Sequence, residues 1–327
     1  MVIEDIFKAL GDPTRLRIAR LLGAMELAVG ELAQVLGQSQ PRVSRHVGIL
    51  CDAGLAERRR EGSWVFLRQS ESSGAVIGAV QDLLALAETA EPAFAALCGA
   101  DRRKLAAIRD AREAAAETYF ARHAGEWDEL RALHSADAEV ETRLADALAD
   151  APLGQLLDIG TGTGRMAEIF ANRAERIVAL DKNLEMLRVA RAKLQHLPAA
   201  QIELVQGDFA ELPFADSSFD TVLLHQVLHF APDPAPALAE AARVLRGGGR
   251  IAIVDFASHD NEDLRTRHQH VRLGFSDRQM ADLLKAAGFV AAAPTALEGG
   301  ELVVKIWTAT RRAAPASPKI PALETAR

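Results

Sequence analysis

Short apolar segments alternate with helical patterns between residues 151 and 310, and this alternation constrains the fold most strongly. The apolar segments have the length of buried strands, and turn residues bound them. Strands that alternate with helices predict a parallel, doubly wound α/β sheet. Two more strands flanking Gly299-Gly300 predict a terminal hairpin. The expected strands are residues 155–159, 177–180, 202–206, 219–224, 250–256, 291–295 and 302–308.

A glycine-rich loop follows the first of these strands. The strand contains Asp158, and the loop runs from Gly160 through Gly162 to Gly164 before a helix begins. Glycine lets the backbone approach a ligand closely, and Asp181, 17 residues after Gly164, can accept the hydroxyls of a ribose. The pattern predicts a nucleotide-type cofactor site. From spacing alone it leaves a dinucleotide and an adenosyl cofactor open.

Residues 1–70 show a different pattern, in which short amphipathic helices precede a hairpin. In the helix after Ser39, apolar residues fall on one face, and the other face carries small and basic side chains. A helix that reads the major groove needs this profile, and a basic hairpin can lie along the phosphate backbone. The predicted DNA contacts are Gln40, Arg42, Ser44, Arg45, His46, Arg58, Arg59 and Arg60.

Composition supports this division. The first 70 residues hold ten basic and eight acidic groups, whereas the whole chain has a net charge of −7. Its two cysteines, Cys51 and Cys98, exclude a disulfide scaffold or a multi-cysteine metal site. We expect a cytoplasmic protein without a membrane segment, because we find neither a secretion signal nor an apolar run of about 20 residues.

The region between these two parts, residues 71–150, is rich in Ala, Glu, Arg and Leu and predicts helices. We expect helices over 75–97, over 101–122 with Asp101 as a possible N-cap, and over 138–148. Tyr119, Phe120, His123, Trp127 and His134 form an unusually aromatic group that allows two interpretations. They pack connecting helices against the next domain, or they form a lid over a ligand pocket.

The N-terminal sequences "ALGDPTRLRIARLL" and "ELAVGELAQVLGQSQPRVSRHVGILCDAGLAERRREGSWVFLR" resemble the winged-helix domain of ArsR-type repressors over residues 4–69. The resemblance implies a homodimer that binds palindromic operator DNA, with helix 75–97 and the N-terminal helix in the dimer interface. Arsenic-sensing members carry two cysteines in the segment that here contains Ala28 and Gly30. Because soft metalloids require sulfur ligands, we expect no metal to bind.

The C-terminal sequences "LLDIGTGTG", "VALDKNLEML", "VQGDFAELPFADSSFDTVLLHQVLHFAPDP" and "ARVLRGGGRIAIVDF" resemble class I S-adenosylmethionine-dependent methyltransferases over residues 153–310. The resemblance implies a Rossmann-like domain that binds S-adenosylmethionine or S-adenosylhomocysteine. It assigns the glycine loop to the methionyl part, Asp181 to the ribose, and residues after the second and third strands to the adenine. The implied cofactor residues are Asp158, Gly160, Gly162, Gly164, Asp181, Asn183, Met186, Asp208, Phe209 and His225.

These observations predict four parts. They are a winged-helix DNA-binding and dimerisation domain at 1–98, a helical connector or lid at 99–150, a methyltransferase-fold domain at 151–310 and a disordered tail at 311–327.

Two functions remain open. The first is a transcriptional regulator, a candidate for control of methionine-cycle genes, that senses the adenosyl compound. The second is an active methyltransferase of a small-molecule acceptor with an attached repressor head. In the second, His225, His229 or Asp255 would serve as a base when the acceptor is protonated.

Overall fold

The structure, a computed structural model, describes residues 3–23, 27–61, 64–70, 74–128, 137–198 and 200–312 of the 327-residue chain. The chain divides into two compact units. One contains Met1–His123, His229–Asp233 and Ser258–Gly274, and the other contains Ala124–Leu228, Pro234–Ala257 and Phe275–Arg327. The predicted four-part division stays a prediction.

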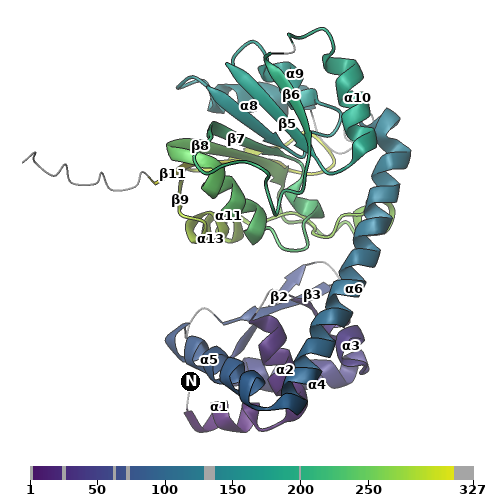
Figure 1. Cartoon of the computed structure of the whole chain (residues 1–327), viewed down its shortest axis with the longest axis vertical. Coiled ribbons are helices and arrows are strands. Elements are labelled where there is room, and N and C mark those ends of the chain that lie inside the picture. The colour runs from purple at the N-terminus through teal and green to yellow at the C-terminus, as the bar shows by residue number, and fades with distance from the viewer. Residues whose placement is uncertain are drawn as a thin grey trace, which may run out of the picture. The chain divides into compact units, whose positions relative to one another are not determined.

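The N-terminal part of the first unit is a helix-turn-helix followed by a β-hairpin (Figure 1). The hairpin forms an antiparallel sheet in the order β1-β3-β2. Apolar faces of the helices enclose one core that includes Ile18, Leu32 and Val47, all at most 1% exposed. The elements are α1 (Ile3–Leu10), α2 (Pro13–Leu22), β1 (Leu27–Ala28), α3 (Val29–Leu36), α4 (Gln40–Asp52), β2 (Ala56–Glu61) and β3 (Trp64–Gln69).

Two long helices follow, α5 (Gly74–Ala90) and α6 (Pro92–His123). The expected single helix over 75–97 is therefore wrong. Helix α5 ends before Glu91, and Pro92 starts α6, where its missing N–H has no intrahelical partner to lose. No single described helix has the length and apolar character of a membrane span, although Ala75–Ala90 and Pro92–Ile108 satisfy that criterion together as a pair bent by 111°.

Asp101 lies inside α6 and does not cap a helix, contrary to the sequence prediction. Its side chain is buried, and Arg17 Nε and Nη2 donate to its two carboxylate oxygens over 2.6 and 2.5 Å. This ion pair fixes α6 to α2. The pairing joins residues 84 positions apart, a distance over which a helical pattern gives no signal.

The second unit is built on an eight-stranded sheet with the path β10-β11-β8-β7-β4-β5-β6, and β9 pairs with β11. Strands β4 to β8 are parallel, and β11 is antiparallel to β8. The predicted doubly wound sheet with a terminal hairpin is confirmed. The strands are β4 (Gln155–Ile159), β5 (Arg176–Asp181), β6 (Ile202–Gln206), β7 (Phe219–His225), β8 (Leu245–Phe256), β9 (Phe289–Ala291), β10 (Thr295–Leu297) and β11 (Val304–Arg311).

Helices cover both faces of this sheet (Figure 1). On one face, α11 and α13 pack on alternate strand residues such as Leu157, Val222 and Ile253. Helices α8, α9 and α10 lie on the other face. The helices are α8 (Asp137–Ala147), α9 (Arg165–Phe170), α10 (Leu184–Leu194), α11 (Ala235–Val244), α12 (Asp263–His268) and α13 (Asp277–Ala286), of which α12 belongs to the first unit.

The end of the chain departs from the sequence prediction at one strand. Residues 291–295 do not form a strand, because β9 ends at Ala291 and β10 begins only after Pro294, which has no N–H to donate. The predicted tail begins at Arg311, which is the last residue of β11. Residues 313–327 lie outside the described part of the chain.

Candidate functional site

The glycine loop connects β4 to α9, and a side chain of β4, that of Asp158, holds it in place. Asp158 is 1% exposed, and its Oδ2 accepts a hydrogen bond from Thr161 Oγ1 over 2.6 Å. The loop also needs its glycines. A Cβ on Gly160 would lie 2.4 Å from Val227 Cγ2, and one on Gly164 would lie 2.9 Å from Leu194 Cδ1. Neither position has room for a side chain, so close packing requires glycine at both.

Asp181, the last residue of β5, joins the glycine loop to the start of α10. Its Oδ2 accepts from the Gly162 amide and its Oδ1 from the Asn183 amide, each over 2.8 Å. Burial raises the pKa of the Asp181 carboxyl, these amides and that of Lys182 lower it, and the net pKa lies above the ordinary value. Such a half-buried carboxylate is a ready acceptor for hydroxyl groups.

The two other predicted residues next to Asp181 contribute to the helix that follows. The Asn183 side chain accepts from the Glu185 and Met186 amides and so caps α10. Met186 is buried in the first turn of α10. The predicted contact of Asn183 and Met186 with an adenine stays a prediction. The capping function of Asn183 was not predicted from the sequence.

Asp208 lies after β6, next to the strand that carries Asp181. It accepts from the Ala210 amide over 2.8 Å and pairs with Lys182 at 2.9 Å. Burial raises the pKa of Asp208, but the Ala210 amide and the Lys182 ammonium lower it to a net value below the ordinary one. Phe209 beside it packs against the core. Lys182 had not been predicted as part of the site.

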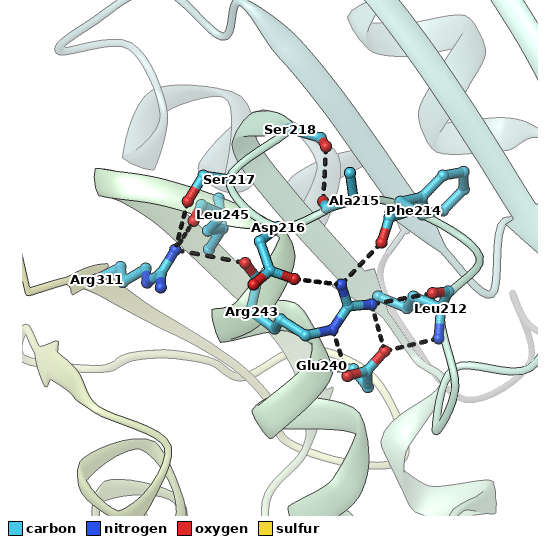
Figure 2. Close-up of polar contacts among 10 residues, drawn as sticks. All are labelled: Leu212, Phe214, Ala215, Asp216, Ser217, Ser218, Glu240, Arg243, Leu245 and Arg311. Atoms are coloured by element: carbon cyan, nitrogen blue, oxygen red, sulfur yellow. Dashed lines mark hydrogen bonds and ion pairs between the residues drawn. The ribbon is translucent and has the colours of Figure 1, made fainter.

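Arg243 at the end of α11 anchors the far end of the loop that carries Asp208 (Figure 2). Its guanidinium donates to both carboxylate oxygens of Glu240 over 2.7 Å and to the carbonyl oxygens of Leu212 and Phe214 over 3.0 and 2.8 Å. Glu240 in turn accepts from the Leu212 amide. The loop between β6 and β7 is thus held to the body of the sheet by side-chain hydrogen bonds.

The two predicted catalytic histidines belong to different units. His225 ends β7 and is buried, directly before Gln226, which adopts a left-handed φ of 53°. His229 is also buried, and its ring stacks on His270 with centroids 4.1 Å apart. Asp255 is buried in β8, where its Oδ1 accepts from the Phe256 amide. A catalytic role for any of them stays a prediction.

Trp127 and Asp128 lie against the glycine loop. The Trp127 Nε1 atom is 3.6 Å from the position that a Cβ on Gly162 would take. Asp128 Oδ1 accepts from Thr163 Oγ1 over 2.7 Å, and its Oδ2 accepts from Lys193 Nζ over 2.5 Å. The cluster of aromatic residues near Trp127 had suggested a lid, but Asp128 gave no signal because Thr163 and Lys193 are distant in sequence.

In the first unit, α4 exposes most of the residues that we predicted to contact DNA. Gln40, Arg42, Ser44 and Arg45 are exposed. His46 is half-buried, and its Nδ1 lies 3.6 Å from Oδ1 of Asp12, the residue that caps α2.

The hairpin of β2 and β3 is the wing of this domain. Its three arginines, Arg58 to Arg60, point to two faces of the hairpin, because side chains alternate along a strand. Arg58 and Arg60 are exposed, and Arg58 donates to the Ser44 carbonyl oxygen. Arg59 lies over the Phe66 ring with its Cζ 4.9 Å from the centroid. The structure therefore brings Arg58 next to α4 and holds Arg59 on the hairpin itself.

Comparison with known proteins agrees with both parts. Residues 10–59 match a helix-turn-helix domain family, and residues 157–253 match a methyltransferase domain family. A demethylmenaquinone methyltransferase of Thermobifida fusca is 37% identical over 151 residues, which are 46% of this chain and 63% of that protein. An uncharacterized 37.1 kDa protein in a Streptomyces fradiae transposon is 37% identical over 167 residues, which are 46% of this chain and 47% of that protein.

The chain therefore spans less than two thirds of the length of these relatives. A solved structure of the same fold is the 1,6-didemethyltoxoflavin N1-methyltransferase of Burkholderia thailandensis with bound 1,6-didemethyltoxoflavin and S-adenosylhomocysteine. It has a TM-score of 0.50 and 23% identity, and the match covers 61% of this chain and 89% of that one. The chain thus joins a helix-turn-helix domain to a methyltransferase domain with the Rossmann-like class I fold.

Proposed function

We propose that this protein is a DNA-binding transcriptional regulator whose methyltransferase domain binds S-adenosylmethionine or S-adenosylhomocysteine as its effector. The observation that carries the proposal is Asp181, a half-buried carboxylate bonded to the Gly162 amide at the carboxyl edge of a parallel sheet. The residues fit an adenosyl ligand. The close packing at Gly160 and Gly164 holds the loop in the form in which its backbone can contact the methionyl part, and Asp181 and Asp208 supply acceptors for the ribose and the adenine.

The DNA-binding part of the proposal rests on α4 and the wing. Gln40, Ser44 and Arg45 on α4 have the size and hydrogen-bonding groups that major-groove contacts need, and Arg58 and Arg60 add positive charge beside them. Arg59 and His46 have partners within the domain, so we assign them to positioning the wing and α4.

The dimer that a palindromic operator requires would use α1 and α5. These helices expose large apolar side chains, among them Phe7 (64% exposed) and Leu86 (68%). Exposed apolar side chains of this size, clustered on two helices, favour association with a second copy.

The effector signal has to come from a site other than a metal centre in the winged-helix domain. Ala28 and Gly30 supply no ligand atoms where arsenic-sensing relatives carry cysteines. That no metal binds here stays a prediction. Helix α6 is fixed to α2 by Asp101 and leads in sequence directly into the segment that contacts the glycine loop. This continuity gives ligand binding a covalent path toward the DNA-binding domain.

Fluorescence-anisotropy titration of a genomic operator fragment tests the proposal. We expect saturating S-adenosylhomocysteine to change operator affinity severalfold, because an effector must bind the DNA-competent and incompetent states differently. Asp181→Ala should abolish this response and leave operator binding without ligand unchanged. An operator affinity that is the same with and without saturating ligand would reject the sensor.

The second candidate is an active small-molecule methyltransferase, and the methyltransferases among the relatives favour it. S-Adenosylmethionine would supply an activated methyl group, so the chain would mainly need to hold the acceptor in line. His225 at the end of β7 is the residue best placed to accept a proton from the acceptor. Transfer of label from S-adenosylmethionine to small molecules of a cell extract tests this candidate, and the absence of label transfer counts against it.

A further inference from the structure

We propose that Asp128 is a positioning residue of the cofactor site, which holds Trp127 against the glycine loop as one wall of the adenosyl-ligand pocket. The inference rests on the proposed binding of an adenosyl ligand. It assigns a binding role to residues that precede the matched methyltransferase domain, which begins at residue 157.

The first support is the way Asp128 connects two elements of the site. One carboxylate oxygen accepts from Thr163 in the glycine loop, and the other accepts from Lys193 in α10. Thr163 is 3% exposed, so its hydroxyl has little access to water and Asp128 satisfies it. The bond to Lys193 is assisted by opposite charges, which makes it stronger than a neutral hydrogen bond.

The second support is the position of the neighbouring indole. The Nε1 and Cδ1 edge of the Trp127 ring lies 3.6 and 3.7 Å from the position that a Cβ on Gly162 would take, and the Gly162 amide is bonded to Asp181. At this point the loop has no side chain of its own to shield a ligand. A large aromatic side chain beside such a backbone surface excludes water from it, and exclusion of water strengthens the hydrogen bonds to a ligand held there.

The third support is the fold of the segment itself. Residues 124–126 form a short 3-10 helix, η2 (Ala124–Glu126), which packs on α10. Ala124 is buried and Glu126 is exposed, so the segment has a defined inner side. Asp128 is the residue of this segment that bonds to both the loop and α10, and its loss should release Trp127.

Calorimetry of the full chain with S-adenosylhomocysteine tests the proposal. Asp128→Asn removes the negative charge that pairs with the Lys193 ammonium, and we expect the affinity to fall at least about fivefold, the ratio that corresponds to one ordinary hydrogen bond. Lys193→Met should weaken binding similarly. Glu126→Gln is the matched control, because it removes the same charge from an exposed position in the same segment and should bind as the wild type does.

Tryptophan fluorescence gives a readout that needs no ligand. The chain has three tryptophans, so the difference between a protein and its Trp127→Phe variant isolates Trp127. We expect Asp128→Asn to shift this difference spectrum to longer wavelengths, since the indole becomes exposed to water. Trp127→Ala should weaken ligand binding, and Trp127→Phe should restore most of it.

The outcomes separate this inference from the proposed function. If the wild type binds S-adenosylhomocysteine and Asp128→Asn binds it equally well, the role of Asp128 is rejected and the proposed function stands. If the wild type does not bind the compound at all, both are rejected. Tighter binding by Trp127→Ala would show that the indole occupies the ligand position, which also overturns the inference.

Discussion

At the scale of single residues, Asp181 combines two requirements that oppose each other. Its carboxylate bonds to the glycine loop and to the start of α10, which organises the site, yet burial penalises its charge. Buried carboxylates with a raised pKa are concentrated at functional positions, because structure alone rarely needs them. The ligand-binding proposal therefore predicts that the affinity for the ligand depends on pH.

We expect affinity for S-adenosylhomocysteine to fall as the pH is lowered through the raised pKa of Asp181. Only the ionised carboxylate can accept from both ribose hydroxyls, so binding is complete above this pKa and is lost below it. Calorimetry from about pH 8 to about pH 5 measures the change, which should begin at a higher pH than for an aspartate with the ordinary pKa of about 3.9. An identical pH dependence in Asp181→Asn would contradict the assignment.

The free energy of unfolding of the unliganded chain should change with pH in the opposite direction to the ligand affinity. The native state binds a proton at Asp181 more readily than the unfolded chain does, because the folded pKa is the higher one. The contribution of Asp181 to the free energy of unfolding therefore rises as the pH falls through that pKa. Urea titrations of the wild type and Asp181→Asn separate this contribution from those of other groups.

At the scale of elements, the turn between the glycine loop and α9 depends on Gly164. This residue has a φ of +83°, and a Cβ on it would lie 2.9 Å from Leu194 Cδ1 and 3.2 Å from Ala190 Cβ. Gly288, after α13, has a similar φ of +87° but no atom within 4 Å of its Cβ position. Alanine substitutions at these two glycines therefore separate the energetic cost of backbone strain, which both share, from that of steric overlap, which only Gly164 has.

We expect Gly164→Ala to destabilise the protein more than Gly288→Ala does. Both variants place alanine in the left-handed region at a cost of about 1–2 kcal/mol. The additional overlap with α10 should cost Gly164→Ala a further ~1–3 kcal/mol and weaken ligand binding. Urea unfolding measures the difference, and equal losses of stability would show that α10 moves away without cost.

The elements also show what a sequence can and cannot predict. Strand periodicity placed β4 and β6 at their observed bounds, and the glycines located the loop, because these features depend on neighbouring residues. Asp101 looked like a helix cap, but its partner is Arg17, and only the fold brings the two together. The same is true of Asp128, whose partners are 35 and 65 residues away.

At the scale of the whole molecule, the proposed regulation is a coupling between two binding sites. Coupling of binding free energies is reciprocal, so operator DNA must change the affinity for the adenosyl ligand by the same factor as the ligand changes the affinity for DNA. Helix α6, with 32 residues, is the element that continues from the DNA-binding domain toward the ligand site along the chain.

We expect calorimetry to give different S-adenosylhomocysteine affinities with and without a saturating operator duplex. Arg45→Ala should weaken operator binding by ~1–3 kcal/mol and leave ligand affinity without DNA unchanged, because Arg45 is exposed on α4. Ligand affinity that does not respond to the operator would show that the two domains function independently.

The contacts of Asp128 also limit how freely the parts of this gene can be exchanged. A recombinant methyltransferase fragment cut at the start of β4 would lack the acceptor for the buried Thr163 hydroxyl and the anion beside Lys193. Modular swapping of the DNA-binding head should therefore fail at junctions after Asp128. The unit that recombination can transfer intact is longer than the segment that sequence similarity delimits.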